Sequence, residues 1–261
     1  MITLWCKDSR SITSYPEHID AVFTSPPYNV GCDYGFDAHD EKIPDKRSGN
    51  DYLDMLMMTF DCCRDRGAKS LWVNMKAGNL NLLNKLNVAA IETKWNYQHT
   101  FCWVYSATNP SGESFGHFQP TRGNNPHWGF ELIYLFSRDE NQVKLNRKAV
   151  GVAYKHKANL TRFTKENGGE PKQDLRCRGN VWCLPYETKF QTGHPCPFPV
   201  GLPEMALRLL DLPPGAMVVD PFCGSGTTGV AAQKLGHHFH GLDLSPKFLS
   251  IAATRLGVNH D

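Results

Sequence analysis

The feature that most restricts the fold of this chain is a glycine-bearing turn close to its C-terminal end. The apolar run Met217–Val219 leads into the turn Asp-Pro-Phe-Cys-Gly-Ser-Gly at residues 220–226, and a helical pattern begins at Thr228. A strand followed by a turn and a helix is the repeating unit of a parallel sheet, because parallel strands need a crossover connection. Glycine lets backbone amides come close to a ligand, and the start of a helix favours negative charge. The turn therefore predicts an α/β fold with a ligand at the carboxyl end of this strand.

An acidic residue follows the next predicted strand. Asp243 lies twenty-three residues after Asp220, at the end of the run Phe239–Leu242. A carboxylate in that place can accept hydrogen bonds from both ribose hydroxyls of a nucleoside. Two phosphate-binding motifs fit less well. The turn opens with Phe-Cys-Gly, which departs from the dinucleotide-binding pattern G-x-G-x-x-G, and it lacks the lysine of a P-loop. We therefore predict a nucleoside cofactor.

Short apolar runs alternate with helical patterns along the chain, which is typical of a mostly parallel sheet with helices on both faces. The predicted strands are Ala21–Phe23, Leu71–Val73, Phe101–Tyr105, Leu132–Phe136, Met217–Val219 and Phe239–Leu242. The predicted helices are Asp51–Asp65, Pro203–Leu210, Thr228–Leu235 and Pro246–Leu256. Ser245 can cap the last helix, and Gly257 can end it. No repeat or Pro/Ser-rich linker divides the chain, so we predict a single domain over residues 1–261.

A second motif lies near the N-terminal end. The predicted strand that ends at Thr24 is followed by Ser25, Pro26, Pro27 and Tyr28. Proline has no amide hydrogen, so the backbone there presents carbonyl acceptors without a competing donor. Ser25 adds a side-chain oxygen and Tyr28 adds a flat ring. A planar group that carries N–H donors fits this combination.

The exocyclic amino group of cytosine or adenine is such a group. The lone pair of its nitrogen is delocalised into the ring, which makes the nitrogen a poor nucleophile. Two acceptors bound to its hydrogens can localise the lone pair, while the ring of Tyr28 stacks on the base. Since the base must leave the duplex to reach such a pocket, the motif implies base flipping. The alternative is that the segment is only a proline-rich turn that ends a strand.

Together the two motifs resemble those of the DNA amino-methyltransferases, the cytosine-N4 and adenine-N6 family. Their order, with Ser-Pro-Pro-Tyr first and the glycine turn last, is similar to the β group of that family. Further stretches that carry the resemblance are Gly179-Asn180-Val181-Trp182, the run His-Pro-Cys-Pro-Phe-Pro at 194–199, Leu202-Pro203-Glu204, and the end of the chain from Gly241 to Leu256. The resemblance covers most of the chain.

The resemblance implies a Rossmann-like methyltransferase fold with a mostly parallel, seven-stranded sheet and a permuted order of motifs. It implies S-adenosylmethionine as cofactor, with the methionine part held by Asp220, Pro221, Phe222, Cys223, Gly224, Ser225, Gly226, Thr227 and Thr228. It also implies that Asp243 binds the ribose and that Phe198 and Leu244 border the adenine, with Pro199 beside them. The catalytic motif would be 25–28.

One segment of the chain is basic, although the net charge of the whole chain is only +2. Residues 138–178 hold eleven Lys and Arg against five Asp and Glu. The resemblance implies that a target-recognition segment is inserted here, over residues 138–180. We expect DNA phosphates to contact Lys155, Lys157, Arg162 and Lys165. The alternative is a solvated loop face. A cognate restriction endonuclease is a further candidate partner.

Composition and spacing argue against several other classes. Nine cysteines, an odd number, and a start without an apolar signal segment predict reduced thiols in the cytoplasm or at the nucleoid, not a secreted protein. The spacing of Cys177, Cys183, His194 and Cys196 fits no zinc site, so we predict no metal. No apolar run approaches the length of a membrane span, so we predict no membrane partner.

Ser25 favours cytosine-N4 as the methylated atom, because serine at this position is commoner in cytosine-N4 enzymes of the family and Asp or Asn is commoner in adenine-N6 enzymes. Adenine-N6 methylation stays open, as does methylation of RNA bases on the same scaffold. Carbon-5 methylation of cytosine needs a thiolate, for which Cys196 is a candidate, but the glycine turn of that family normally comes first. A catalytically silent DNA-binding module is the last alternative, and both intact motifs argue against it.

Overall fold

The computed structural model describes residues 1–29, 31–76, 80–108, 111, 114–116, 129–140, 142–153, 175–187 and 193–259. Its main element is an eight-stranded sheet in which seven strands run in one direction and β7 runs antiparallel to both of its neighbours. The strands, in the order in which they lie in the sheet, are β1 (Ile2–Cys6), β12 (His238–Asp243), β11 (Met217–Asp220), β2 (Ala21–Thr24), β3 (Ser70–Lys76), β7 (Phe130–Ser137), β4 (Asn96–Val104) and β10 (Val181–Cys183).

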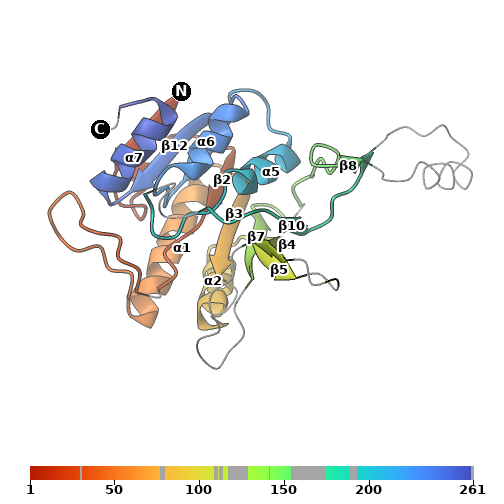
Figure 1. The fold of residues 1–261 in the computed structure, drawn as a ribbon. Helices are drawn as coiled ribbons and strands as arrows, with labels where there is room; N and C mark the ends of the chain where they lie inside the picture. The colour runs from red at the N-terminus through yellow and green to blue at the C-terminus, as the bar shows by residue number, and fades with distance from the viewer. Residues whose placement is uncertain are drawn as a thin grey trace, which may run out of the picture.

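Helices cover both faces of the sheet (Figure 1). On one face, α5 (Gly201–Leu210), α6 (Thr227–Lys234) and α7 (Pro246–Leu256) pack into a core that includes Phe239 and Trp182. On the other face, α1 (Gly49–Asp65) and α2 (Leu80–Glu92) pack into a second core. These two layers bury the sheet and leave its edges and strand ends for function.

Five short elements of the described residues lie outside the main sheet and its helices. A 3₁₀ turn, η1 (Ile12–Ser14), follows β1. The hairpin of β5 (Ser106–Thr108) and β6 (Ser114–Gly116) follows β4. β8 (Val152–Ala153) and β9 (Leu175–Arg176) pair at the base of the basic segment.

The sequence-based elements agree with the structure within a few residues. Each of the six predicted strands and each of the four predicted helices has a counterpart, and α7 has the predicted bounds. The sheet has one strand more than the resemblance implies, because the three residues of β10 pair with β4. Ser245 occupies the N-cap position of α7, but its hydroxyl makes no capping hydrogen bond, contrary to our expectation. Its backbone N–H donates to Asp243 instead, 2.8 Å away.

Strand order places the two sequence motifs side by side. β2 and β11 are neighbours in parallel register, with Val218 opposite Ala21, although they lie almost 200 residues apart in the chain. β12 lies on the other side of β11, and β1 lies beyond it. The carboxyl ends of these four strands therefore meet at one edge of the sheet, where ligands of open α/β sheets bind. None of the described helices is long and apolar enough to cross a membrane.

Candidate active site

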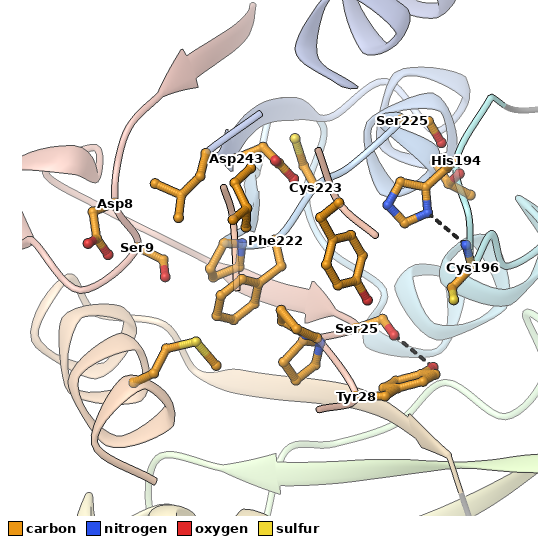
Figure 2. Close-up of a pocket in the computed structure, with 18 of the residues that line it drawn as sticks. Asp8, Ser9, Ser25, Tyr28, His194, Cys196, Phe222, Cys223, Ser225 and Asp243 are labelled. Atoms are coloured by element: carbon orange, nitrogen blue, oxygen red, sulfur yellow. Dashed lines mark hydrogen bonds between the residues drawn. The ribbon is translucent and has the colours of Figure 1, made fainter. Parts of the chain in front are cut away.

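A single cavity at this edge of the sheet is lined by residues of both motifs (Figure 2). It encloses about 940 Å³ of empty space, with the open mouth included. Predicted site residues that line it are Ser25, Pro26, Pro27, Tyr28, Phe198, Pro221, Phe222, Cys223, Ser225, Thr227, Asp243 and Leu244.

At one end of the cavity lies the carboxylate of Asp243, at the end of β12. Its Oδ2 accepts from the backbone N–H of Gly224 at 2.8 Å, and its Oδ1 accepts from Ser245 N at 2.8 Å. Each carboxylate oxygen has a second lone pair, so the group keeps acceptors for a ligand. Burial raises the pKa of Asp243 to about 6, since a low-dielectric setting disfavours the charged form.

Asp220 does not line the cavity. It is fully buried, and its Oδ1 accepts from the Thr24 hydroxyl and its Oδ2 from the Thr228 hydroxyl, both at 2.7 Å. A third hydrogen bond comes from Phe222 N at 3.1 Å. The carboxylate thus joins the end of β2 to the end of β11 and the start of α6. The Thr228 hydroxyl is committed to this cluster and does not line the cavity either.

Three further predicted residues, Gly224, Gly226 and Pro199, do not line the cavity but shape the backbone near it. Gly224 and Gly226 have φ of +49° and +77°, which glycine adopts without the strain that other residues meet. A Cβ on Gly224 would meet the His194 ring at 2.9 Å, so the turn and this ring pack without spare room. Pro199 accepts from Leu202 N at 2.9 Å and thereby starts α5.

Ser25 and Tyr28 lie at the other end of the cavity, after β2. Their hydroxyl oxygens are 2.9 Å apart, and Figure 2 shows the two groups directed at each other. The Tyr28 hydroxyl also contacts Glu131 on β7 and Asn74 on β3. Burial raises the pKa of Tyr28 well above its ordinary value, so the phenol stays protonated.

The loop that follows Tyr28 is held by one carboxylate. Asp45 accepts from the backbone N–H of Asn29 at 3.0 Å and of Cys32 at 2.7 Å. The Asn29 side chain in turn pairs with the backbone of Arg47, accepting from its N–H at 2.6 Å and donating to its carbonyl at 3.2 Å. These contacts fold the segment 45–47 back against the residues that follow Tyr28.

Several residues at the cavity were not predicted from the sequence. The segment Lys7–Arg10, after β1, lines the wall near Asp243. His194 packs edge-on against Phe248, and burial lowers its pKa to about 4, which leaves the ring neutral at pH 7. The segment after β1 could have been found only by recognising β1 as a strand. His194 lies in a run that the resemblance had singled out, but without a role.

The basic residues predicted to contact DNA, Lys155, Lys157, Arg162 and Lys165, lie outside the described residues. At the described ends of the same segment, Arg147, Lys148 and Arg176 are exposed. Among the residues that the structure describes, no group of three or more His, Cys, Asp or Glu is placed to hold a metal ion.

Comparison with known proteins identifies the family. The sequence profile of the N6/N4 family described as DNA methylase matches residues 19–254. The chain is 24% identical to the DNA adenine methyltransferase YhdJ of Escherichia coli (strain K12) in an alignment 255 residues long that covers 93% of this chain and 77% of that protein.

Solved structures share the fold. The PvuII DNA methyltransferase (cytosine-N4-specific) aligns with a TM-score of 0.68 at 20% identity, over 97% of this chain and 86% of that one. The M1.HpyAVI–SAM complex aligns with a TM-score of 0.61 at 17% identity, over 99% of this chain and 100% of that one. These likenesses confirm the predicted fold class, and the matched profile confirms the predicted family. The chain belongs to the N6/N4 family of DNA methylases.

Proposed function

We propose that this DNA methyltransferase moves a methyl group from S-adenosylmethionine to the exocyclic N4 of cytosine, in a base turned out of the duplex. The observation that carries the proposal is that one cavity holds the Asp243 carboxylate at one end and Ser25 and Tyr28 at the other. A cofactor bound by the first group and a base bound by the second would meet inside it.

The residues at the Asp243 end fit the methyl donor of this family, S-adenosylmethionine. Asp243 retains acceptors for two ribose hydroxyls, and the apolar side chains of Phe222, Leu244 and Phe198 line the same cavity. The adjacent backbone is turned tightly at Gly224, whose positive φ brings the chain close to the cavity. When bound, the cofactor supplies a methyl group on a sulfonium, which an amine can attack directly.

The residues at the Ser25 end fit an amino group of a base. The Ser25 oxygen and the Pro26 carbonyl are acceptors, and Pro26 brings no backbone N–H to compete with them. Stacking of a base on an aromatic ring such as that of Tyr28 contributes roughly 1–3 kcal/mol. The base must be flipped to reach these groups, and the energy of stacking offsets part of the cost of unpairing.

Carbon-5 methylation fits the site less well. That reaction needs a thiolate, and burial together with the Cys32 thiol, whose sulfur is 3.2 Å away, raises the pKa of Cys196 to about 12. The Cys223 thiol is also buried, with a pKa well above its ordinary value. Both groups stay protonated near neutral pH, which favours direct transfer to nitrogen. Adenine-N6 is the second candidate acceptor, because one relative is named as an adenine methyltransferase.

We further propose that the basic segment binds DNA phosphates through Lys155, Lys157, Arg162 and Lys165. The exposed Arg147, Lys148 and Arg176 at its described ends support this assignment, since they add three cations that are free to meet phosphates. A cognate restriction endonuclease is the proposed partner in the host.

Sequencing DNA from an expressing host, with single-molecule detection of modified bases, tests the acceptor base. We expect N4-methylcytosine at one short sequence, and a much smaller modified fraction of these sites in a host that expresses the Ser25→Ala protein. N6-methyladenine as the sole modification would overturn the choice of base while leaving the class of enzyme intact. A host in which neither mark appears would contradict the proposed function.

The affinity for S-adenosylmethionine should fall as the pH drops below about 6, the pKa to which burial raises Asp243. The ionised carboxylate accepts hydrogen bonds, and protonation removes an acceptor. The affinity for S-adenosylmethionine is therefore highest above this pKa, and it falls by up to about tenfold per pH unit below it. Calorimetry between about pH 5 and pH 7.5 measures the effect. The matched Asp243→Asn protein should bind more weakly by roughly 1.5–3 kcal/mol, and with little pH dependence. A wild-type affinity that stays constant over this range would contradict the role of Asp243.

A further inference from the structure

A buried polar network stands behind the catalytic motif and ends in a carboxylate. The Tyr28 hydroxyl donates to Glu131 Oε2 at 2.8 Å. The Asn74 side-chain amide donates both to the Tyr28 hydroxyl oxygen, at 2.9 Å, and to the same Glu131 oxygen, at 2.7 Å. Tyr28, Asn74 and Glu131 are all buried, so water does not compete for these contacts.

The direction of each hydrogen bond follows from the number of hydrogens available. An ionised Glu131 can only accept, so the single hydrogen of the Tyr28 hydroxyl goes to it. The Tyr28 oxygen then accepts from Asn74 and from Ser25, whose hydroxyl lies 2.9 Å away. The Ser25 hydrogen has two acceptors within reach, the Tyr28 oxygen at 2.9 Å and the Asn74 carbonyl at 3.3 Å, and the shorter contact makes Ser25 the donor toward Tyr28. The lone pairs of Ser25 stay open for an N–H of the substrate. A protonated Glu131 would remove this constraint.

The electrostatic setting makes Glu131 a better base than an exposed carboxylate. Burial raises its pKa, and the contacts from Asn74 and Tyr28 and the charge of Lys76 offset that rise only in part. Lys76 stands opposite Glu131 on β3. Within the part of the chain that the structure describes, the protonated side chains of Tyr105, Tyr186 and Cys196 also interact with it.

We infer that Glu131 is the terminal acceptor of the proton that the exocyclic amine loses on methylation, and that Ser25 and Tyr28 relay this proton. The inference rests on the proposed function. As the N–CH₃ bond forms and the C–S bond breaks, the nitrogen becomes positive. Its N–H hydrogen passes to the Ser25 oxygen, the Ser25 hydrogen passes to Tyr28, and the Tyr28 hydrogen passes to Glu131. The product leaves neutral, and one carboxylate has become a carboxylic acid.

A structural role and a proton-accepting role for Glu131 make different demands. A neutral amide of the same shape could accept from Tyr28 and Asn74, and so could hold the two side chains in place. It could not take up a proton. Glu131→Gln therefore separates positioning from proton transfer, and Glu131→Asp restores the carboxylate on a shorter side chain.

Single-turnover methyl transfer to DNA at saturating cofactor, measured against pH, tests the relay. General-base catalysis typically contributes roughly 10²–10⁴-fold, so we expect Glu131→Gln to slow transfer about 100-fold. The wild-type rate should fall on the acid side as Glu131 becomes protonated, and this acidic limb should vanish in Glu131→Gln and return in Glu131→Asp. Glu92→Gln, at an exposed carboxylate at the end of α2, is the matched control and should leave rate and pH profile unchanged.

Tyr28→Phe is the second variant, because it removes the middle oxygen of the relay and keeps the ring. It should slow transfer to a similar degree, and the double variant should be no slower than either single one, since the groups act as a unit. A wild-type rate and pH profile in Glu131→Gln, or a wild-type rate in Tyr28→Phe, would overturn the relay. Absence of transfer by the wild-type protein would instead contradict the proposed function.

Discussion

Replacement of Ser25 by alanine is expected to slow methyl transfer about 100- to 1,000-fold, the usual effect of removing one preorganised hydrogen-bonding group from a transition state. The Ser25 oxygen lines the cavity and accepts, in our account, an N–H of the target amine as positive charge grows on the nitrogen. The Pro26 carbonyl remains as the second acceptor, so some turnover should survive. Affinity for the cofactor should not change, because Asp243 lies at the other end of the cavity.

Rapid-quench single-turnover assays and calorimetry measure these two quantities on the same protein. Ser11→Ala is the matched control, since Ser11 is exposed and lies outside the cavity. It should behave as the wild type in both assays. If Ser25→Ala transferred methyl groups at the wild-type rate, or lost cofactor affinity instead of rate, the role of Ser25 as an acceptor for the amine would be wrong.

Asp220→Ala should lower the free energy of unfolding by about 2–5 kcal/mol, because it removes the hydrogen-bond partner of the Thr24 hydroxyl and of the Phe222 N–H, at roughly 1–3 kcal/mol each. The Thr228 hydroxyl would keep only a longer contact to the Phe23 carbonyl, at 3.4 Å. Asp220 is fully buried, and Thr24 and Thr228 both donate to it at 2.7 Å. The contacts tie β2, β11 and α6 together at the point where the two motifs meet. We therefore expect the loss of stability to be accompanied by weaker cofactor binding.

The Asp220→Asn protein separates charge from hydrogen bonding. Burial raises the pKa of Asp220 to about 6, so its charge at neutral pH is itself unfavourable to the folded state. An amide avoids this cost and keeps one acceptor, and we expect it to be more stable than Asp220→Ala. Urea denaturation of the three proteins at pH 7.5 gives the comparison. Equal stability of Asp220→Ala and the wild type would show that the cluster is not structural.

Periodicity predicted the centre of the sheet well and its edges poorly. β11 and β12 are short apolar runs bounded by polar turns, which leaves little choice of structure. β1 is half-buried along most of its length and was not recognised, and with it the wall of the cavity at Lys7–Arg10 was missed. α2 was not predicted, because its sequence LNLLNKLNVAAIE is rich in asparagine, a residue with low helix propensity.

Residues of the two sequence motifs line one cavity, because both motifs end parallel strands that are neighbours in one sheet. The role of Asp220 was not foreseen, since the same carboxylate at a strand end can face a ligand or the core. Glu131 gave no sequence signal at all. It lies at the start of β7, and because β7 is antiparallel, its start reaches the edge where the parallel strands end. Only the pairing of β3 with β7 reveals this.

The most direct test of the account is to incubate the protein with S-adenosylmethionine that carries a labelled methyl group and with duplex DNA or RNA of matched sequence, and then to identify the labelled nucleoside by mass spectrometry. The account predicts label in DNA alone, on the exocyclic amino group of cytosine. It also predicts that the rate of labelling falls strongly in Asp243→Ala and Ser25→Ala proteins that remain folded. Label at carbon 5 of cytosine, label in RNA alone, or no transfer by the wild-type protein would contradict it.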